Sequence, residues 1–223
     1  MPGARVLCCD RWTMKIDVFH DTACPWCRIG KKHLQLALAD WPEPAPVAYH
    51  TFFLNDAIPP EGVEFRPYMR QKGGNRIPLE QFFDAPRQRG AEVGLVFNFE
   101  QIEKAPNTTL SHRLIALTPP EQKEAVIDAV YAAYFEHGRD IGDLDELVSI
   151  AAACGLDAAA IRAQLQADDG LAQVLAEAEW ARAQGISGVP FFIVNGRYAF
   201  SGAQPPHLIR RVLEQAAAEQ ATL

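Results

Sequence analysis

The pattern of hydrophobic and polar positions divides this chain into a β-rich start, a long helical middle and a β-rich end. Residues 15–20 alternate as a β-strand does, residues 28–39 place apolar side chains at helical spacing, and residues 47–53 again favour a strand. The proline-rich segment 41–46 prevents the helix from continuing. These elements predict a right-handed βαβ unit with parallel strands.

Helical periodicity dominates from about residue 58 to residue 185. Helices are predicted over residues 65–71, 79–90, 108–117, 121–137, 143–154, 157–167 and 171–184. The apolar run 190–194, the turn Asn195-Gly196 and residues 197–200 then predict a β-hairpin, and Pro205-Pro206 opens a final helix. Neither β-containing piece forms a covered sheet alone, so the two must pair with each other.

Composition and charge narrow the classes of protein. The chain has 223 residues, of which 48% are hydrophobic, and a formal net charge of −7. Scattered Lys and Arg with a negative net charge argue against nucleic-acid binding. No apolar run reaches the roughly 18 residues that a membrane span needs. The N-terminus lacks the apolar stretch of a secretory signal, so we expect a cytoplasmic protein.

Five cysteines are present, at positions 8, 9, 24, 27 and 154. An odd number at irregular spacing is not a disulfide framework. Cys8 and Cys9 precede the first strand, and we expect them to lie in a frayed extension, with Met14 as the true start. Cys154 falls in an alanine-rich helix and is predicted to be a small buried hydrophobic residue.

Cys24-Pro25-Trp26-Cys27 stands where the first strand gives way to the first helix. Free backbone N–H groups and the helix dipole at that point favour the thiolate form of Cys24, which makes it the attacking sulfur. Cys27, one turn further, resolves the mixed disulfide. Pro25 suits the first helical turn, and Trp26 is expected to cover the sulfurs and to meet substrate. A zinc site would need two more suitably spaced ligands, so no metal is expected.

Pro190 directly precedes the apolar run and has two interpretations. It is an ordinary strand-initiating proline, or it is a cis-proline that presents the backbone of Val189 to an extended substrate. The Cys-x-x-Cys motif favours the second interpretation.

Three segments together, residues 21–27, 188–192 and 201–204, resemble the DsbA-like thioredoxin superfamily, and specifically its FrnE-like branch of cytoplasmic proteins. The resemblance runs from Met14 to Ala217. It implies an α/β, thioredoxin-like fold, in which a central mixed β-sheet is flanked by helices and interrupted by a large all-helical insertion. The implied parts are residues 14–57, the insertion 58–185 and residues 186–220.

The same resemblance implies roles for single residues. Cys24 would be the nucleophile, Cys27 the resolving thiol and Pro190 a cis-proline. Relatives include kappa-type glutathione transferases and hydroxychromene-carboxylate isomerases, which usually have Ser at the nucleophile position, so Cys24 counts against their chemistry. By position alone, Val189, Ser201 and Gly202 are candidate glutathione contacts.

Three further residues carry alternatives. Asp21 is either a proton acceptor behind the cysteines or a helix cap or solvated surface group. Asn107 and His112 either line the cleft from the helical block or are a helix N-cap and a polar surface residue.

The predicted function is that of a protein disulfide oxidoreductase or isomerase that needs no metal or organic cofactor, with glutathione as a candidate co-substrate. Its partners would be protein or small-molecule thiols and disulfides. Two rivals stay open: a glutathione-dependent isomerase or transferase, and a non-enzymatic holdase or binding module. The direction of the redox reaction, the recycling partner and the formation of a homodimer, through the insertion or the edge of hairpin 195–200, are left open.

Overall fold

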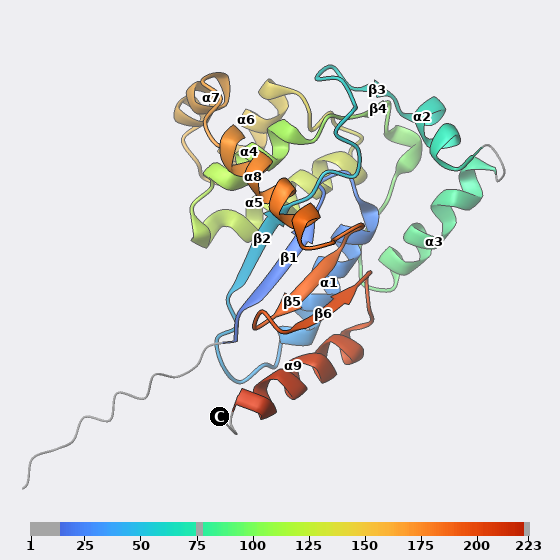
Figure 1. The fold of residues 1–223 in the computed structure, drawn as a ribbon. Helices are drawn as coiled ribbons and strands as arrows, with labels where there is room; N and C mark the ends of the chain where they lie inside the picture. Colours follow the sequence, from blue (N-terminus) through green and yellow to red (C-terminus); the bar gives the residue numbers. More distant parts are fainter. Residues whose placement is uncertain (1–13, 75–77, 221–223) are drawn as a thin grey trace, which may run out of the picture.

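A computed structural model describes residues 14–74 and 78–220 of the chain (Figure 1). The predictions for Cys8 and Cys9 therefore fall outside the described residues. Within these ranges, none of the helices combines the length and the apolar character that crossing a bilayer requires.

A four-stranded mixed sheet is built from the two ends of the chain. Its strands are β1 (Ile16–His20), β2 (Val47–Thr51), β5 (Phe191–Val194) and β6 (Tyr198–Ser201), in the order β2-β1-β5-β6. β1 is parallel to β2 and antiparallel to β5, and β5 is antiparallel to β6. The predicted pairing of the two β-containing pieces is confirmed.

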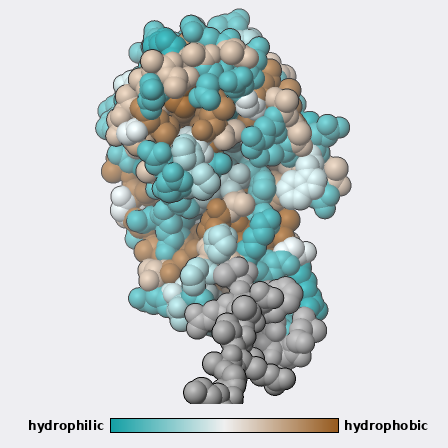
Figure 2. Space-filling model, turned by 90° about the vertical axis from the view of Figure 1, so that its left-hand side faces the viewer, coloured by the Kyte–Doolittle hydropathy of each residue, from teal (hydrophilic) through white to brown (hydrophobic). Residues whose placement is uncertain are grey.

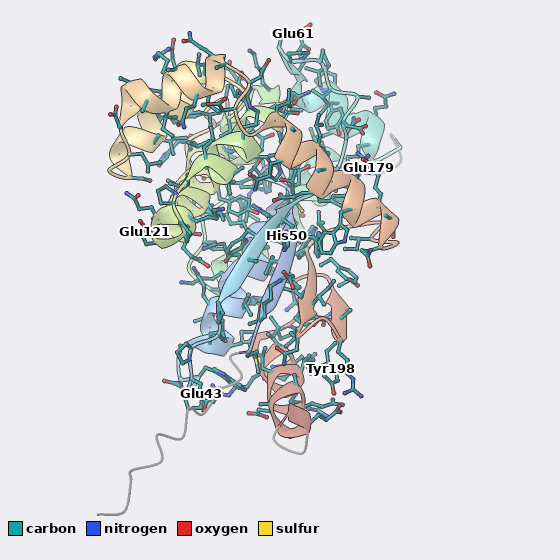
Figure 3. All side chains as sticks on the ribbon, turned by 60° about the vertical axis from the view of Figure 1, so that its left-hand side comes forward. Glu43, His50, Glu61, Glu121, Glu179 and Tyr198 are labelled. Carbon is teal, nitrogen blue, oxygen red and sulfur yellow. The ribbon has the colours of Figure 1, made fainter. Side chains whose placement is uncertain are left out.

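Helices cover both faces of this sheet. α1 (Pro25–Leu38) and α9 (Pro206–Gln220) pack against each other on one face, over Ile16 and Val18. α8 (Leu171–Ala183) crosses the other face beside β2, where Ala181 packs on Phe19. Figure 3 shows His50 of β2 beneath this helix, which also carries Glu179. β1 is thereby buried along its whole length, which explains its nearly continuous hydrophobic character.

The insertion gathers at one end of the sheet, as Figure 1 shows. Its helices are α2 (Phe65–Lys72), α3 (Leu79–Ala91), α4 (Thr109–Leu117), α5 (Pro120–Phe135), α6 (Leu144–Ala153), α7 (Ala158–Gln166) and α8. The expectation of an all-helical insertion is wrong in detail, because β3 (Val63–Glu64) pairs with β4 (Lys104–Ala105) in a small antiparallel sheet. Strands of two residues are too short to leave a detectable alternation. The proposed part boundaries 14–57, 58–185 and 186–220 stay predictions.

α1 begins at Pro25, which agrees with the expectation that this proline occupies the first helical turn, although the amphipathic pattern is visible only from residue 28. One local expectation needs correction. Cys154 is not fully buried inside a helix. It lies half-buried at the C-cap of α6 and packs against the core from its edge.

Gly30 allows α1 to approach the segment around Pro190 closely. A Cβ atom at Gly30 would lie 2.9 Å from Cγ of Pro190 and 3.2 Å from Cζ of Phe192. Phe192 lies in β5 and Pro190 directly precedes that strand, and both side chains are buried, so they have little freedom to withdraw. Because Gly30 has no side chain, α1 can pack directly against Pro190.

We predict that Gly30→Ala lowers the free energy of unfolding by about 1–3 kcal/mol, because the added methyl group overpacks this contact. Urea unfolding measures the change. Gly188→Ala is the matched control, since a Cβ atom there meets nothing within 4 Å. An equal loss in the two variants would contradict the account.

The core encloses two histidine side chains next to the end of β1. His20 and His112 are 2% and 1% exposed, and their rings meet edge to face at 5.3 Å. Burial lowers the pKa of His112 to about 3, and it lowers the pKa of His20 well below its ordinary value. Nε2 of His112 has no hydrogen-bond partner among the described residues. His112 is therefore a neutral core residue, and the expectation of a polar surface residue is wrong.

This burial predicts acid sensitivity. As the pH falls below 6.5, the unfolded chain binds a proton at His112 before the folded protein does, so stability present above pH 6.5 is lost down to about pH 3. Between pH 7 and pH 4 the loss from this residue amounts to about 3 kcal/mol. In urea unfolding at both pH values, His112→Phe should lose that much less than the wild type. The exposed His207→Phe control should behave as wild type, and an unchanged pH dependence in His112→Phe would refute the assignment.

Candidate active site

The two cysteines occupy the start of α1, at the carboxyl end of β1. Cys24 is the N-cap residue, and its N–H donates to the carbonyl of Asp21 at 3.0 Å. The N–H of Cys27 donates to the carbonyl of Cys24 at 3.1 Å, which closes the first turn. Both side chains are free thiols and are almost completely buried, at 3% and 1% exposed. The structure therefore presents the pair in its dithiol form.

Burial gives Cys27 a distinct character. Desolvation raises the pKa of the Cys27 thiol well above its ordinary value, and a hydrogen bond with the Cys24 side chain raises it further. A hydrogen bond with the backbone of Asp21 lowers this pKa in part, and the charge of the Asp21 carboxyl group adds a smaller rise. Cys27 therefore keeps its proton until a nearby group accepts it.

The segment before β5 lies beside Cys24. The peptide bond between Val189 and Pro190 is cis, and Sγ of Cys24 lies 3.8 Å from the carbonyl oxygen of Val189. The carbonyl of Pro190 accepts a hydrogen bond from the N–H of Gly202 at 2.8 Å. Gly202 and the exposed Ser201 line a shallow hollow together with Val189 and Pro190. The four residues predicted to contact substrate or glutathione in this region therefore lie together, next to Cys24. They are Val189, Pro190, Ser201 and Gly202.

Asp21 is buried behind the cysteines. Its Oδ1 accepts the N–H of Ala23 at 2.9 Å, and its Oδ2 accepts the N–H of Leu54 at 2.7 Å. Desolvation raises the pKa of this carboxyl group, and the backbone hydrogen bonds offset the rise only in part. At 2% exposed it is no solvated surface group, and it does not cap α1. The interpretation of Asp21 as an ordinary cap or surface acid is therefore wrong.

Buried hydrogen bonds from the insertion hold the segment that leads to Cys24. The hydroxyl of Tyr131 on α5 lies 2.9 Å from Nδ1 of His20, and it donates to the carbonyl of Asp21 at 3.4 Å. Oγ1 of Thr22 lies 2.8 Å from Oγ of Ser111 on α4. These roles cannot be recognised in the sequence. Three tyrosine and phenylalanine side chains at helical spacing on α5 indicate only core packing, and nothing local singles out Ser111.

A buried lysine further along α1 was also missed. Lys31 is 2% exposed, and its Nζ lies 2.5 Å from a carboxylate oxygen of Glu124 and 2.8 Å from one of Asp128. Both acids lie on α5. These ion pairs join α1 to the insertion, and removing both acids would leave the buried Lys31 ammonium without a counter-charge.

A cavity of about 380 Å³ opens beside Cys24, between the cysteine segment and the insertion. Its wall includes Cys24, Pro25 and Trp26 from α1, whereas most of the remainder is apolar and comes from the segment after β2 and from the insertion. That remainder includes Leu54, Ile58, Phe65, Tyr68, Met69, Lys72, Phe82, Phe83, Phe99, Thr108 and Tyr134. The Trp26 ring is 37% exposed. It stands between this cavity and a second hollow that is lined by Pro190 and Gly202.

Asn107 and His112 are not part of this cavity wall. The Nδ2 group of Asn107 donates to the carbonyl of Ile58 at 2.6 Å, and its Oδ1 accepts the N–H of Thr109 in the first turn of α4. Asn107 thus has a role close to that of a helix cap. In residues 14–74 and 78–220, no group of three His, Cys, Asp or Glu side chains is placed to hold a metal ion.

Comparisons with known proteins agree with this geometry. A structure described as a probable DsbA oxidoreductase from Streptomyces coelicolor is 30% identical, with a TM-score of 0.83 over 92% of this chain and 91% of that chain. The cytosolic disulfide reductase DsbM from Pseudomonas aeruginosa, solved with GSH, is 18% identical and has a TM-score of 0.64 over 94% of this chain and 100% of that chain.

A 2-hydroxychromene-2-carboxylate isomerase has the same fold at 14% identity, with a TM-score of 0.71 over 93% of this chain and 98% of that chain. The DSBA-like thioredoxin domain family matches residues 15–214. These residues include β1, both cysteines, the whole insertion, Pro190 and most of α9. The chain therefore belongs to the DSBA-like thioredoxin domain family.

Proposed function

We propose that this protein is a thiol–disulfide oxidoreductase that exchanges electrons between substrates and the Cys24–Cys27 pair. The observation that carries the proposal is the contact between two thiols at the first turn of α1, one of which borders an open cavity. Membership of the DSBA-like family supports the same chemistry. Assignment to the FrnE-like branch and to the cytoplasm is part of this proposal.

The reaction follows from the different positions of the two sulfurs. The Cys24 thiolate, favoured by the N–H groups at the start of α1, attacks a substrate disulfide, and one substrate thiolate leaves with the electrons of the broken bond. Cys27 then loses its proton and attacks Cys24. The Cys24–Cys27 disulfide forms, and the second substrate thiol is released. Two electrons pass to the substrate, and the reverse sequence oxidises a dithiol.

Asp21 is the proposed proton acceptor for Cys27. The Cys27 thiol is buried and holds its proton firmly, so its attack needs a base nearby. Asp21 lies close enough to influence the pKa of Cys27, and its own raised pKa makes it a better base than an exposed carboxylate.

Backbone and aromatic groups around Cys24 are the proposed substrate contacts. The carbonyl of Val189 faces the sulfur and suits pairing with an extended peptide or a tripeptide such as glutathione. Pro25 and Trp26 offer apolar surface beside it. Ser201 and Gly202 are candidate contacts for glutathione as a co-substrate. The exchange requires no metal or organic cofactor, and its partners would be protein or small-molecule thiols and disulfides.

A glutathione-dependent isomerase is the second candidate. The apolar cavity beside Cys24 and the fold shared with the 2-hydroxychromene-2-carboxylate isomerase favour it. Such a reaction would depend on glutathione and would survive the loss of Cys27.

A holdase would need a broad apolar surface. Hydrophobic residues reach the face drawn in Figure 2 in areas separated by hydrophilic ones, which gives that rival little support there.

Replacing Cys24 and replacing Cys27 should have different effects on the reaction. Cys24→Ser is expected to abolish reduction of insulin and of small disulfides. Cys27→Ser should retain the first attack and accumulate a mixed disulfide at Cys24, which intact-protein mass spectrometry detects. Cys154→Ser is the matched control and should keep full activity. Undiminished turnover in Cys24→Ser would refute the proposal, and glutathione-dependent isomerisation that persists in Cys27→Ser would support the second candidate.

Asp21→Asn should slow the attack by Cys27 by about a hundredfold, because the base is lost. Quenched-flow release of the second substrate thiol measures this step across pH 5 to 9. In the wild type the rate should rise as Asp21 loses its proton, at a pH above the usual range for aspartate, and this rise should be absent in the variant. Asp17→Asn, at a buried carboxylate on β1 that pairs with Lys15 and His50, is the control. The same pH profile in Asp21→Asn and wild type would show that Asp21 has only a structural role.

A further inference from the structure

The residues that line the cavity beside Cys24 bear on which substrates the protein accepts. We propose that it is a specificity pocket for disulfides in which an aromatic ring bearing a carboxylate stands beside the reacting sulfur. The inference rests on the proposed exchange chemistry at Cys24 and extends it to the class of substrate.

The first support for this proposal is the limited access to the Cys24 sulfur. Cys24 is only 3% exposed, and it lines this cavity but none of the three other hollows described at the surface. A disulfide must therefore place one of its halves in the cavity for the sulfurs to meet. A small molecule or a flexible chain enters such a space more readily than a disulfide held in the surface of a rigid protein.

The second support is the group of aromatic rings in the cavity wall. The Phe83 ring stacks on Phe65 and on Phe99, with centroids 5.6 Å and 4.4 Å apart, and it meets Phe82 edge to face. All four residues line the cavity. A volume of about 380 Å³ lies within the range for small-molecule sites, so the space is large enough for a substituted aromatic ring. A flat aromatic group would meet such walls edge to face or offset-stacked.

The third support is the positive charge of Lys72 in the cavity wall. Lys72, at the end of α2, lines the cavity and forms no ion pair with another described residue, although it lies over the Tyr68 ring at 5.9 Å. The acid in the wall, Asp21, already has both of its oxygens occupied by backbone N–H groups. Lys72 acts on the charge of Asp21 only through space, so it is the cation in the described part of the wall that an anionic group on the ligand can pair with. Because Lys72 is exposed, its effect should be moderate.

The covalent steps are those of simple exchange. Cys24 forms a bond to the sulfur of the aromatic half, the substrate disulfide breaks, and the other half leaves as a thiolate. Cys27 then bonds to Cys24 and releases the aromatic thiolate from the pocket. The substrate gains two electrons, and the enzyme pair loses two.

Single-turnover kinetics with pre-reduced enzyme test the proposal. Three disulfides are compared: 5,5′-dithiobis(2-nitrobenzoic acid), which is aromatic and anionic; 4,4′-dithiodipyridine, which is aromatic and neutral; and bis(2-hydroxyethyl) disulfide, which is small and aliphatic. The rate in Cys24→Ser is subtracted each time to remove the contribution of other thiols. Ratios of variant to wild type for each compound cancel its intrinsic reactivity.

Two variants separate the ring from the charge. Lys72→Gln should slow the anionic aromatic compound about fivefold and leave the two neutral compounds unchanged. Met69→Trp fills the cavity from α2, so it should slow both aromatic compounds at least tenfold and spare the aliphatic one. Lys123→Gln on α5, outside the cavity wall, is the matched control. Circular dichroism checks that each variant folds.

The outcomes distinguish the two proposals. If no compound shows a phase that depends on Cys24, the proposed oxidoreductase function is wrong. If that phase is present but Lys72→Gln and Met69→Trp change the three compounds equally, the exchange chemistry stands and the specificity pocket is refuted.

Discussion

The proposed exchange requires the Cys24 sulfur to meet a substrate and then to bond to Cys27, so the segment that leads into α1 has to keep a fixed position. Here the constraint is met by buried hydrogen bonds to residues 20–23. Asp21 is fixed through its side chain to Leu54 and through its carbonyl to Tyr131, and Thr22 meets Ser111. The contacts of Tyr131 and Ser111 lie in the core, where a hydrogen bond is costly to leave unmade. Cys24 therefore has a defined position relative to both the sheet and the insertion.

The insertion contributes to chemistry as well as to stability. α4 and α5 supply the partners of the cysteine segment, and α5 carries the acids that pair with the buried Lys31. α2 and α3 supply much of the apolar wall that stands opposite Trp26. In the proposed mechanism, the sheet and α1 place the reactive sulfur, and the helical block restricts which molecules reach it. A fold that is shared by a disulfide reductase and an isomerase is compatible with different substrates, because the cavity wall can differ.

Most of the architecture could be predicted from local patterns. The strand before the cysteines, the parallel βαβ unit and the pairing of the two β-containing pieces follow from periodicity and from the need to cover a sheet. The burial of Asp21 and His112 could not be predicted in this way. Their surroundings come from residues up to about a hundred positions distant, as in the contact of Tyr131 with the Asp21 carbonyl. Polar residues look solvated in a sequence when their partners are that remote, and β3 and β4 are too short to show a period.

The most direct test of the account is the behaviour of Cys24 and Cys27 in glutathione redox buffers, followed by alkylation and peptide mass spectrometry. The account predicts that both thiols disappear together in one two-electron transition and reappear as a Cys24–Cys27 disulfide, while Cys154 stays open to alkylation. Independent oxidation of the two thiols, each ending as a separate glutathione adduct with no bond between them, would contradict it.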